Sequence, residues 1–377
     1  MDGCCKNKSD GLRISKRVNT ELNVSSTAVK LSAENLRDFI SRLFEAAGVS
    51  SSDSAAVAES LVESNLCGHE SHGVMRVREY VDQLHAGELK PGVDWTVHQE
   101  TDSLLVADAN LGFGQVQMRR LIDSLAPKAE RQGIACGALR RCGHVGRLGE
   151  WVQRVASRGL AALMSVNDNG VLQCVAPPGG TAPRISTNPM AIGVPTSGEP
   201  LVLDISTSAV ANGKIQVAAL AGAEVPQGWI QDADGRPTTD PHTRFADPPG
   251  TLLPMGGETG FKGFGLGMFL DLLVGGLCGG SCPPAGEAGE ATNNALIVVW
   301  HPGRFHGSEH LVGEAAKLVD YVRSTPLKSG VDSIRLPGDR SRELRAARLR
   351  DGVPLDDGTW DSLHKLAEGL NVQTPVS

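Results

Sequence analysis

Apolar residues in the first part of the chain recur every three to four positions, which is the spacing of an amphipathic helix. The recurring positions are Leu36, Ile40, Leu43 and Phe44. They follow Ser32, a residue type that caps helix N-termini, so a helix is predicted from this point. A second helix is predicted from about Ser52 to Leu66, and it leads into a segment that contains several histidines.

From about residue 104 onward, short apolar runs alternate with amphipathic stretches. Strands are predicted over residues 104–107, 133–139, 160–166, 201–204 and 295–300. Helices are predicted over 115–132, where Pro127 should interrupt the second half, and over 147–157 and 264–277. After Glu309 the pattern is helical again, with a short helix over 360–369. This alternation indicates an α/β sheet domain, flanked at both ends of the chain by helical segments.

Two stretches lack such a pattern. Residues 1–27 show no apolar period and are expected to form a flexible arm. Residues 221–260 are rich in Gly, Pro and Asp and are expected to form long loops over the site.

Charge and composition narrow the classes of partner. The net charge of −7 disfavours nucleic acid and anionic membrane as partners, and the longest apolar run, Ala295 to Trp300, is too short to span a bilayer. The polar and basic stretch from Met1 to Arg17 is unlike a secretory signal, and the eight cysteines are typical of reduced thiols in the cytoplasm. With 45 glycines and only 4% aromatic residues, the chain is suited to bringing its backbone close to a ligand.

The segment from Gly68 to Tyr80 holds the first candidate chemistry. His72, Arg76 and Tyr80 are spaced by four residues, and four helical residues advance only ~40° around the axis. On a helix these side chains would share a face that could grip a carboxylate and move a proton beside it. A solvated, charged helix face is the alternative interpretation of the same spacing.

Familiar signatures fit poorly. Gly112-Phe-Gly114 lacks the third glycine of a dinucleotide fingerprint, and Gly263-Phe-Gly265 has the wrong spacing. His69 and His72 are three residues apart, whereas the zinc motif places its histidines four apart, and no Cys or carboxylate cluster supports a metal site. We therefore expect neither a Rossmann domain nor a bound metal.

Other segments could complete a site. His144 lies in a glycine-bounded loop between a predicted strand and helix, where ligands often bind in α/β sheets. The run Asp204 to Ser208 follows a strand and could hold ribose hydroxyls and phosphate, or could simply cap a helix. Lys262 precedes a predicted helix N-terminus, which suits a phosphate.

Taken together, these segments resemble the malate/L-lactate dehydrogenase family, whose nucleotide domain is not a Rossmann fold. That family also includes ureidoglycolate dehydrogenase, sulfolactate dehydrogenase, diketogulonate reductase and a cyclic imino acid reductase. Nine segments match in the family's order, over most of the chain. They are Ser71–Tyr80, Gly143–Gly149, Ser186–Pro189, Asp204–Ser208, Gly213–Ile215, Val225–Trp229, Asp232–Thr238, Lys262–Leu266 and Leu336–Asp339. Cys142-Gly143 departs from the Asn-Ser that many members have before the second histidine.

The resemblance implies an architecture. It implies an α/β fold with a non-Rossmann, mixed-sheet nucleotide domain and a helical domain built from both ends of the chain. Residues 28–125 with 306–377 would form the helical substrate and dimerisation domain, and residues 126–305 the NAD(P)-binding domain. A homodimer is implied, with its active sites close to the subunit contact.

The resemblance also implies roles for individual residues. His72 matches the proton donor of diketogulonate reductase-like members, and His144 matches the proton acceptor of ureidoglycolate dehydrogenase-like members. Arg76 and Tyr80 match positions that contact the substrate, while Ser71 or Tyr80 would orient the substrate or a histidine. The cofactor contacts would be Asn167, Asp204, Ser206, Thr207, Ser208, Phe261, Lys262, Gly338, Asp339 and Arg340.

The function expected on this basis is hydride transfer between NAD or NADP and C2 of a small 2-hydroxy or 2-oxo acid, such as a malate-like or lactate-like substrate. Arg76 would bind the carboxylate, and His72 or His144 would exchange the proton on the C2 oxygen. Three alternatives remain: a cyclic imino acid reductase using the same site, a zinc-dependent hydrolase, and a non-catalytic relative.

Overall fold

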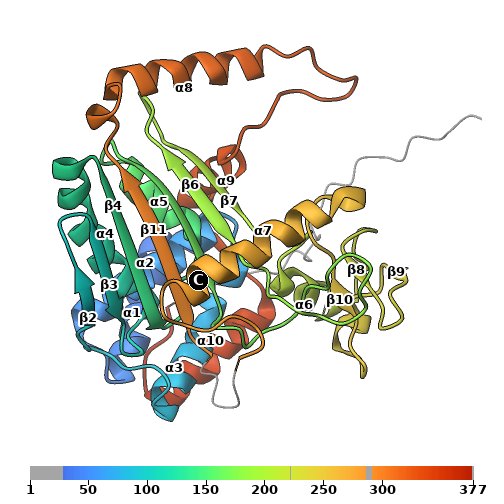
Figure 1. The fold of residues 1–377 in the computed structure, drawn as a ribbon. Helices are drawn as coiled ribbons and strands as arrows, with labels where there is room; N and C mark the ends of the chain where they lie inside the picture. The colour runs from blue at the N-terminus through green and yellow to red at the C-terminus, as the bar shows by residue number, and fades with distance from the viewer. Residues whose placement is uncertain (1–28, 221, 286–290, 376–377) are drawn as a thin grey trace, which may run out of the picture.

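The structure is a computed structural model that describes residues 29–220, 222–285 and 291–375 (Figure 1). The arm expected over residues 1–27 lies outside the described residues. Among the residues described, no helix has both the length and the apolar character needed to cross a membrane.

Helices from both ends of the chain pack into one body. They are α1 (Ala33–Ala46), α2 (Ser51–Leu66), α3 (Val77–Ala86) and α10 (Asp357–Leu370). Strand β1 (Val29–Leu31) pairs antiparallel with β12 (Val353–Leu355), which ties the two ends together. Leu36, Phe39 and Val57 of the N-terminal segment share one buried cluster with Leu363 and Ala367 of the C-terminal segment. The helical part built from both ends of the chain is thus confirmed.

The middle of the chain forms a seven-stranded sheet in the order β2-β3-β4-β11-β5-β6-β7. Its strands are β2 (Thr96–Glu100), β3 (Leu104–Asp108), β4 (Ile134–Cys142), β5 (Ala161–Asn167), β6 (Met190–Val194), β7 (Leu201–Ile205) and β11 (Asn293–Trp300). Strands β3 and β4 run parallel, whereas every other neighbouring pair in this sheet is antiparallel. A mixed sheet of this kind is not the parallel sheet of a Rossmann fold, so the predicted fold class is confirmed.

Two helices, α4 (Gly114–Gln132) and α5 (Leu148–Ala156), pack against the large sheet. Met118, Leu121 and Trp151 from these helices are buried in the same cluster as Ile297 of the central strand β11. The expected interruption at Pro127 is wrong, because α4 continues through this residue to Gln132.

A smaller lobe lies to one side of the large sheet (Figure 1). It contains α6 (Asn212–Leu220) and a three-stranded sheet of β8 (Ile230–Gln231), β9 (Pro237–Thr238) and β10 (Thr251–Leu252). Residues 222–260 lie mostly in loops, as expected, and the loops are interrupted by these two-residue strands and two short 3₁₀ turns. These very short strands are held by a buried cluster that includes Val175, Ile185 and Ile230, contacts that no local sequence pattern reveals.

The remaining helices connect these parts. Helix α7 (Phe261–Asp271) continues into a π-helical turn (Leu272–Gly276), and β11 is followed by α8 (Ser308–Arg323) and α9 (Asp339–Asp351). In Figure 1, α8 lies at the upper edge of the molecule, and the chain returns from it to α9 in a long loop. Strands β2 and β3 lie before residue 126 but belong to the large sheet. The domain boundaries given above remain a prediction.

Candidate active site

The segment that carries His72 and Arg76 is not a continuous helix, so the expected single helix face is wrong. Glu70–His72 and Val74–Arg76 each form a 3₁₀ turn, and α3 begins only at Val77. Gly73 separates the turns in an extended conformation, where the side chain of Asn65 accepts the Val74 N–H at 2.8 Å. A Cβ at Gly73 would overlap the Asn65 side chain, so only glycine allows this close approach.

The two histidines expected at the site nevertheless meet, although 72 residues separate them in sequence. His72 Nδ1 lies 3.2 Å from His144 Nε2, which is hydrogen-bonding distance. Their ring planes are inclined by only 12°, with centroids 5.2 Å apart. Both residues are partly accessible to solvent.

Tyr80 lies on the other side of His144. Its hydroxyl is 2.6 Å from His144 Nδ1, and the Gln115 amide Nε2 donates to the same hydroxyl oxygen at 3.1 Å. Both Tyr80 and Gln115 are buried. The four side chains therefore form one hydrogen-bonded chain that ends at His72, and we call it the histidine chain.

Burial and nearby cations keep the imidazoles neutral. Desolvation, with the positive charges of Arg76 and Arg147, lowers the pKa of His72 from 6.5 to about 4. Desolvation, then His72 and Arg76, lowers the pKa of His144 well below its usual value. The pKa of Tyr80 is raised, chiefly because its hydroxyl is buried. Near neutral pH, each imidazole of the free protein therefore carries a single proton.

Arg76 and Ser71 lie beside this chain. The Arg76 guanidinium donates from Nε to the Ser71 carbonyl at 2.8 Å and from Nη1 to Glu79 at 2.6 Å. Its Nη2 makes no hydrogen bond to a residue that the structure describes. The Ser71 side chain faces α6, since a Cβ placed on Gly213 would lie 3.1 Å from the Cβ of Ser71.

The loop that carries His144 is held by close backbone contacts. Gly143 N–H donates to Gly112 O at 2.9 Å, and Val145 N–H donates to the Asn293 side chain at 3.0 Å. Gly114 starts α4 so close to this loop that a Cβ there would overlap the His144 carbonyl. Gly114 and Gly143 thus allow the start of α4 and the His144 loop to lie in direct backbone contact.

The Asp204 side chain contacts the chain just after the His144 loop. Its carboxylate accepts the Gly149 N–H at 2.7 Å, at the N-terminus of α5, where a negative charge is favourable. Burial raises the pKa of Asp204, and the nearby Arg147 opposes this rise. Of the two roles considered for Asp204, the structure displays helix capping.

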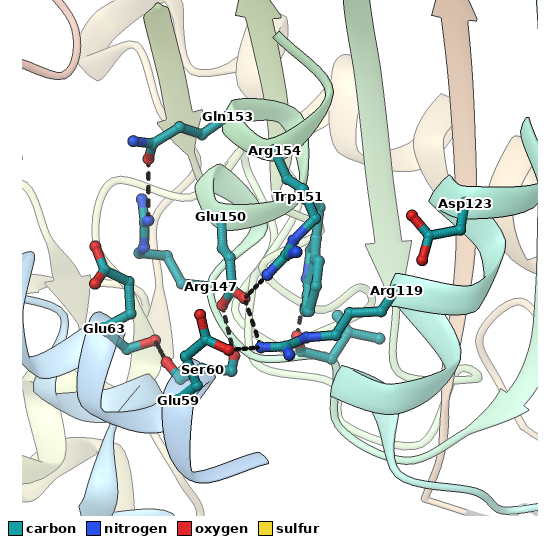
Figure 2. A network of polar contacts seen from close by, with 12 residues as sticks. Glu59, Ser60, Glu63, Arg119, Asp123, Arg147, Glu150, Trp151, Gln153 and Arg154 are labelled. Atoms are coloured by element: carbon teal, nitrogen blue, oxygen red, sulfur yellow. Dashed lines mark hydrogen bonds and ion pairs between the residues drawn. The ribbon is translucent and has the colours of Figure 1, made fainter. Parts of the chain in front are cut away.

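A second polar cluster joins the helices α2, α4 and α5 (Figure 2). Glu150 is 8% exposed and accepts the Ser60 hydroxyl at 2.5 Å. Arg119 lies 2.9 Å from Glu59 and 3.9 Å from Glu150, and Arg154 lies 3.9 Å from Glu150. We call these five residues the Glu150 network.

Asn167, the first expected cofactor residue, is buried at the end of β5. Its amide donates to Asp271 and to the Ser281 carbonyl, both at 3.0 Å, and its Oδ1 accepts from Asn294 at 2.9 Å. Asn188 also donates to Asp271, at 2.6 Å. Asn167 is therefore part of a buried amide network that fastens β5 to α7.

The next three expected cofactor residues follow β7. The hydroxyls of Ser206, Thr207 and Ser208 donate to backbone carbonyls at 2.7–3.1 Å, and Ser208 also donates to the Ser206 hydroxyl. Thr207 packs closely on α7, since a Cβ on Gly267 would lie 2.7 Å from the Thr207 hydroxyl. The end of β7 and helix α7 thus lie side by side.

Phe261 and Lys262 start α7 and point outward. The Phe261 side chain is 62% exposed, and Lys262 Nζ lies 5.9 Å from the centre of its ring. No side chain in the described part of the chain caps this helix N-terminus, and Lys262 is exposed. Backbone N–H groups and a cation are therefore free at this point.

Gly338, Asp339 and Arg340 lie at the N-terminus of α9, apart from α7 along the chain. Gly338 has a left-handed conformation with φ of 89°, and Asp339 accepts the Leu336 N–H at 2.8 Å and pairs with Arg323 and Arg342. The neighbouring Ser341 hydroxyl is 3.3 Å from His69 Nε2. This group is therefore close to the histidine segment.

His69 and His72 contact different residues: His69 lies against Ser341, and His72 lies against His144. Within residues 29–220, 222–285 and 291–375, no three His, Cys, Asp or Glu side chains are grouped in a way that could hold a metal ion. The three-residue spacing of these histidines thus serves two separate contacts.

Several residues of this region were not expected from sequence. Gln115, Asn188 and Asp271 are buried polar residues inside helices or loops, and Arg147 is only 4% exposed. Gln115 stands in the run after Gly112, which was considered only as a nucleotide fingerprint. A buried polar residue has no local signature, because its partner is distant in sequence.

Known proteins resemble this chain along nearly its whole length. The family model for malate/L-lactate dehydrogenase matches residues 31–364. L-lactate dehydrogenase of Cupriavidus necator is 34% identical over 353 residues, covering 93% of this chain and 100% of that protein. The Delta(1)-pyrroline-2-carboxylate/Delta(1)-piperideine-2-carboxylate reductase of Pseudomonas putida is 32% identical over 349 residues, covering 91% and 98%. The solved structure of malate dehydrogenase from Pyrococcus horikoshii has a TM-score of 0.84 at 26% identity, covering 93% and 98%.

Proposed function

The chain belongs to the malate/L-lactate dehydrogenase family, and from this premise we propose that it is an oxidoreductase that interconverts small 2-hydroxy and 2-oxo acids with a nicotinamide cofactor. The observation that carries the proposal is the contact of His72 with His144 beside Arg76. The guanidinium can bind the carboxylate of a 2-hydroxy or 2-oxo acid, and the two histidines can exchange a proton with the oxygen on the adjacent carbon.

Arg76 is proposed to bind the substrate carboxylate. Its Nη2 is free of other contacts within the described residues, while Glu79 and the Ser71 carbonyl hold the guanidinium in place. A guanidinium held in this way is preorganised for a carboxylate. Ser71 and Tyr80 are proposed to orient the substrate or the histidines.

His72 and His144 are proposed to exchange the proton on the C2 oxygen. Reduction of a 2-oxo acid adds a hydride to C2 and a proton to its oxygen, and oxidation reverses both transfers. A bound substrate carboxylate would offset the positive charges of Arg76 and Arg147, which lower the pKa of His72 in the free protein. Substrate binding would therefore ease protonation of the pair when the reaction needs it.

The residues present suit a nicotinamide cofactor. The N-terminus of α7 offers uncapped N–H groups beside Lys262, a donor set that fits a diphosphate. The cofactor supplies the hydride when it is bound. The other expected cofactor residues are proposed to shape the cofactor site or to contact the cofactor. They are Asn167, Asp204, Ser206, Thr207, Ser208, Phe261, Gly338, Asp339 and Arg340. Either NAD or NADP is compatible with these residues.

A homodimer is proposed on the evidence of α7 and the turn that follows it. Phe269, Leu272 and Leu277 are 61%, 51% and 69% exposed, and Met268 and Leu273 are more than one-third exposed. An apolar stripe of this size on a helix is typical of an interface between proteins. Residues 28–125 with 306–377 are proposed as the substrate and dimerisation domain, and residues 126–305 as the cofactor domain.

A second candidate is a cyclic imino acid reductase. The Pseudomonas putida reductase, at 32% identity over 349 residues, favours it. The same arginine would bind the ring carboxylate, and the hydride would reach carbon of a C=N bond. The nitrogen would then take the proton.

The test is oxidation of NADH and of NADPH by the full-length protein with pyruvate, oxaloacetate and Δ1-piperideine-2-carboxylate. Turnover with an oxo acid supports the proposal, and turnover with the cyclic imine alone supports the second candidate. Loss of activity with a chelator would favour metal-dependent chemistry instead. Absence of NAD(P)H oxidation with every compound would indicate a non-catalytic relative.

A further inference from the structure

Gln115 lies at the inner end of the histidine chain, on the first turn of α4. Its side chain is fully buried, and its amide nitrogen is 3.1 Å from the Tyr80 oxygen. The amide oxygen has no hydrogen-bond partner among the described residues. The one polar contact of this buried amide is thus directed at the tyrosine that touches His144.

An amide nitrogen can only donate, which fixes the direction of the first hydrogen bond. The directions of the others follow from placing the phenol proton on the one remaining partner of the Tyr80 hydroxyl, His144 Nδ1. The Tyr80 oxygen accepts from Gln115, so the phenol proton is free to point at His144 Nδ1, 2.6 Å away. A neutral His144 that accepts at Nδ1 carries its own proton on Nε2. That proton then points at His72 Nδ1, which is 3.2 Å away.

We propose that Gln115 is a positioning residue of the active site, which acts through Tyr80 and His144 to make His72 present an N–H at Nε2. The inference rests on the proposed function, because it concerns the proton that faces the C2 oxygen. An Nε2–H would donate a hydrogen bond to the carbonyl oxygen of a 2-oxo acid, where negative charge develops during reduction.

The surroundings of the chain agree with this assignment. Burial and the cations Arg76 and Arg147 lower the pKa of His72, so the free protein holds a neutral imidazole with one proton to place. Burial raises the pKa of Tyr80, so the phenol keeps its proton and can donate it as a hydrogen bond. The chain therefore orders tautomers and does not lead protons to solvent.

The reverse set of hydrogen-bond directions would place the histidine protons on the other ring nitrogens. If the side chain at position 115 accepted from Tyr80, the phenol oxygen would accept from His144 Nδ1–H. His144 Nε2 would then accept from His72 Nδ1–H, and His72 Nε2 would present a lone pair. Gln115→Glu should select this arrangement at a pH high enough to ionise the buried carboxyl, because an ionised carboxylate has no proton to donate.

Neutron diffraction from crystals exchanged into D₂O tests the inference without any turnover. We expect deuterium on Nε2 of both His72 and His144, and the Tyr80 deuterium directed at His144. Deuterium on Nδ1 of His72 in the unliganded protein would overturn the inference. In the Gln115→Glu protein, deuterium should move to Nδ1 of both histidines.

Kinetics of matched variants provide the second readout. Gln115→Met keeps the length of the side chain but cannot hydrogen-bond, and should lower kcat about 5–10-fold, the worth of one neutral hydrogen bond. Gln117→Met is the control, because Gln117 is also buried on α4 but donates to the Val93 carbonyl at 3.0 Å. Equal kcat values for the two variants would contradict a positioning role.

The pH profile separates positioning from packing. Gln115→Glu should raise the apparent pKa of the kcat/KM profile by about one unit, since it adds a negative charge near His144. An unchanged profile in a folded variant would overturn the inference. If the deuterium positions are as expected but no oxo or imino acid is reduced, the proposed function fails while the assigned hydrogen-bond direction stands.

Discussion

The histidine chain and the Glu150 network are two buried polar clusters with opposite electrostatic character. In the Glu150 network, a carboxylate lies among Arg119 and Arg154 and accepts a hydroxyl proton from Ser60. Around the histidine chain, burial and the cations Arg76 and Arg147 keep the imidazoles neutral. Arg76 pairs with Glu79 through Nη1, but its Nη2 makes no hydrogen bond to a residue that the structure describes. The Glu150 network holds a carboxylate beside its cations, whereas the two histidines contact no carboxylate among the described residues.

Whether a buried polar cluster supports the fold or the chemistry depends on how its charges are matched. Charges that are matched within the fold join its elements, as Glu150 joins α5 to α2 and α4 (Figure 2). Titratable groups without a matching charge, reachable from solvent, are suited to binding and catalysis. The predictions below test whether the two clusters can be separated in this way.

The largest effect is expected from His72→Ala. Removing a general acid–base should lower turnover about 10²–10⁴-fold while stability changes little, because this side chain is partly accessible. Steady-state kinetics with the best substrate of the panel measures it, with the exposed His85→Ala on α3 as control. Turnover like that of the control would assign the proton exchange to His144 or rule out a catalytic role for His72.

Glu150→Ala should show the reverse pattern. Breaking a buried ion pair costs about 3–5 kcal/mol in the free energy of unfolding, because Arg119 and Arg154 lose the nearby carboxylate and the Ser60 hydroxyl loses its acceptor. Denaturant titration measures this loss, and kcat of the folded variant should stay within about threefold. Asp38→Ala, in an exposed pair with Arg42, is the control and should cost at most ~1 kcal/mol. A fall in kcat as large as that of His72→Ala would break the comparison.

Arg76→Met should weaken substrate binding. Loss of a charge-assisted contact of about 1.5–3 kcal/mol corresponds to a roughly 10–100-fold fall in kcat/KM, mostly through KM. The control is Arg78→Met on the adjoining helix α3, where the guanidinium pairs with Asp82 at 3.0 Å and the side chain is 50% exposed. An unchanged KM for every oxo acid would show that another group binds the carboxylate.

The smallest expected effect is the change in the free energy of unfolding with pH. The contributions of His72 and Glu150 to this change should have opposite signs. The pKa of His72 falls from 6.5 to about 4 on folding, so its contribution to stability is present above pH 6.5 and is lost as the pH falls toward 4. The pKa of Glu150 is raised by burial, so its contribution is present below its ordinary value of 4.5 and is lost as the pH rises through the folded value.

Thermal unfolding at pH 7 and pH 5 checks these signs. The Tm of His72→Asn should fall less between the two pH values than that of the natural chain, and the Tm of Glu150→Gln should fall more. The same pH dependence in all three proteins would contradict the different ionisation of the two clusters.

The fold was predictable wherever a local pattern carried it. Ser32 accepts the Asn35 N–H as the predicted N-cap, and the apolar run 295–300 lies within the central strand β11. Strands β2 and β6 were not foreseen. All of β2 is exposed, so its sequence has no apolar face. The burial of β6 does alternate, but its sequence, Met-Ala-Ile-Gly-Val, has no polar residue to show that alternation.

The site was predictable in its residues more than in its geometry. The four-residue spacing of His72, Arg76 and Tyr80 suggested one helix face, but Gly73 breaks the helix. His72 and Tyr80 still converge, because each contacts His144 in a different loop. Such a contact depends on the tertiary structure, which places the loop between β4 and α5 against His72 and Tyr80, and no periodicity along the chain contains it.

The central claim is that the His72–His144 pair and Arg76 bind and transform a 2-oxo acid. The most direct test is a crystal structure of the protein with oxidised cofactor and oxalate, an unreactive analogue of a 2-oxo acid. We predict one oxalate carboxylate on the Arg76 guanidinium and an oxygen of the other carboxylate within hydrogen-bonding distance of a ring nitrogen of His72 or His144. Oxalate bound elsewhere, with both histidines and Arg76 free of it, would contradict the claim.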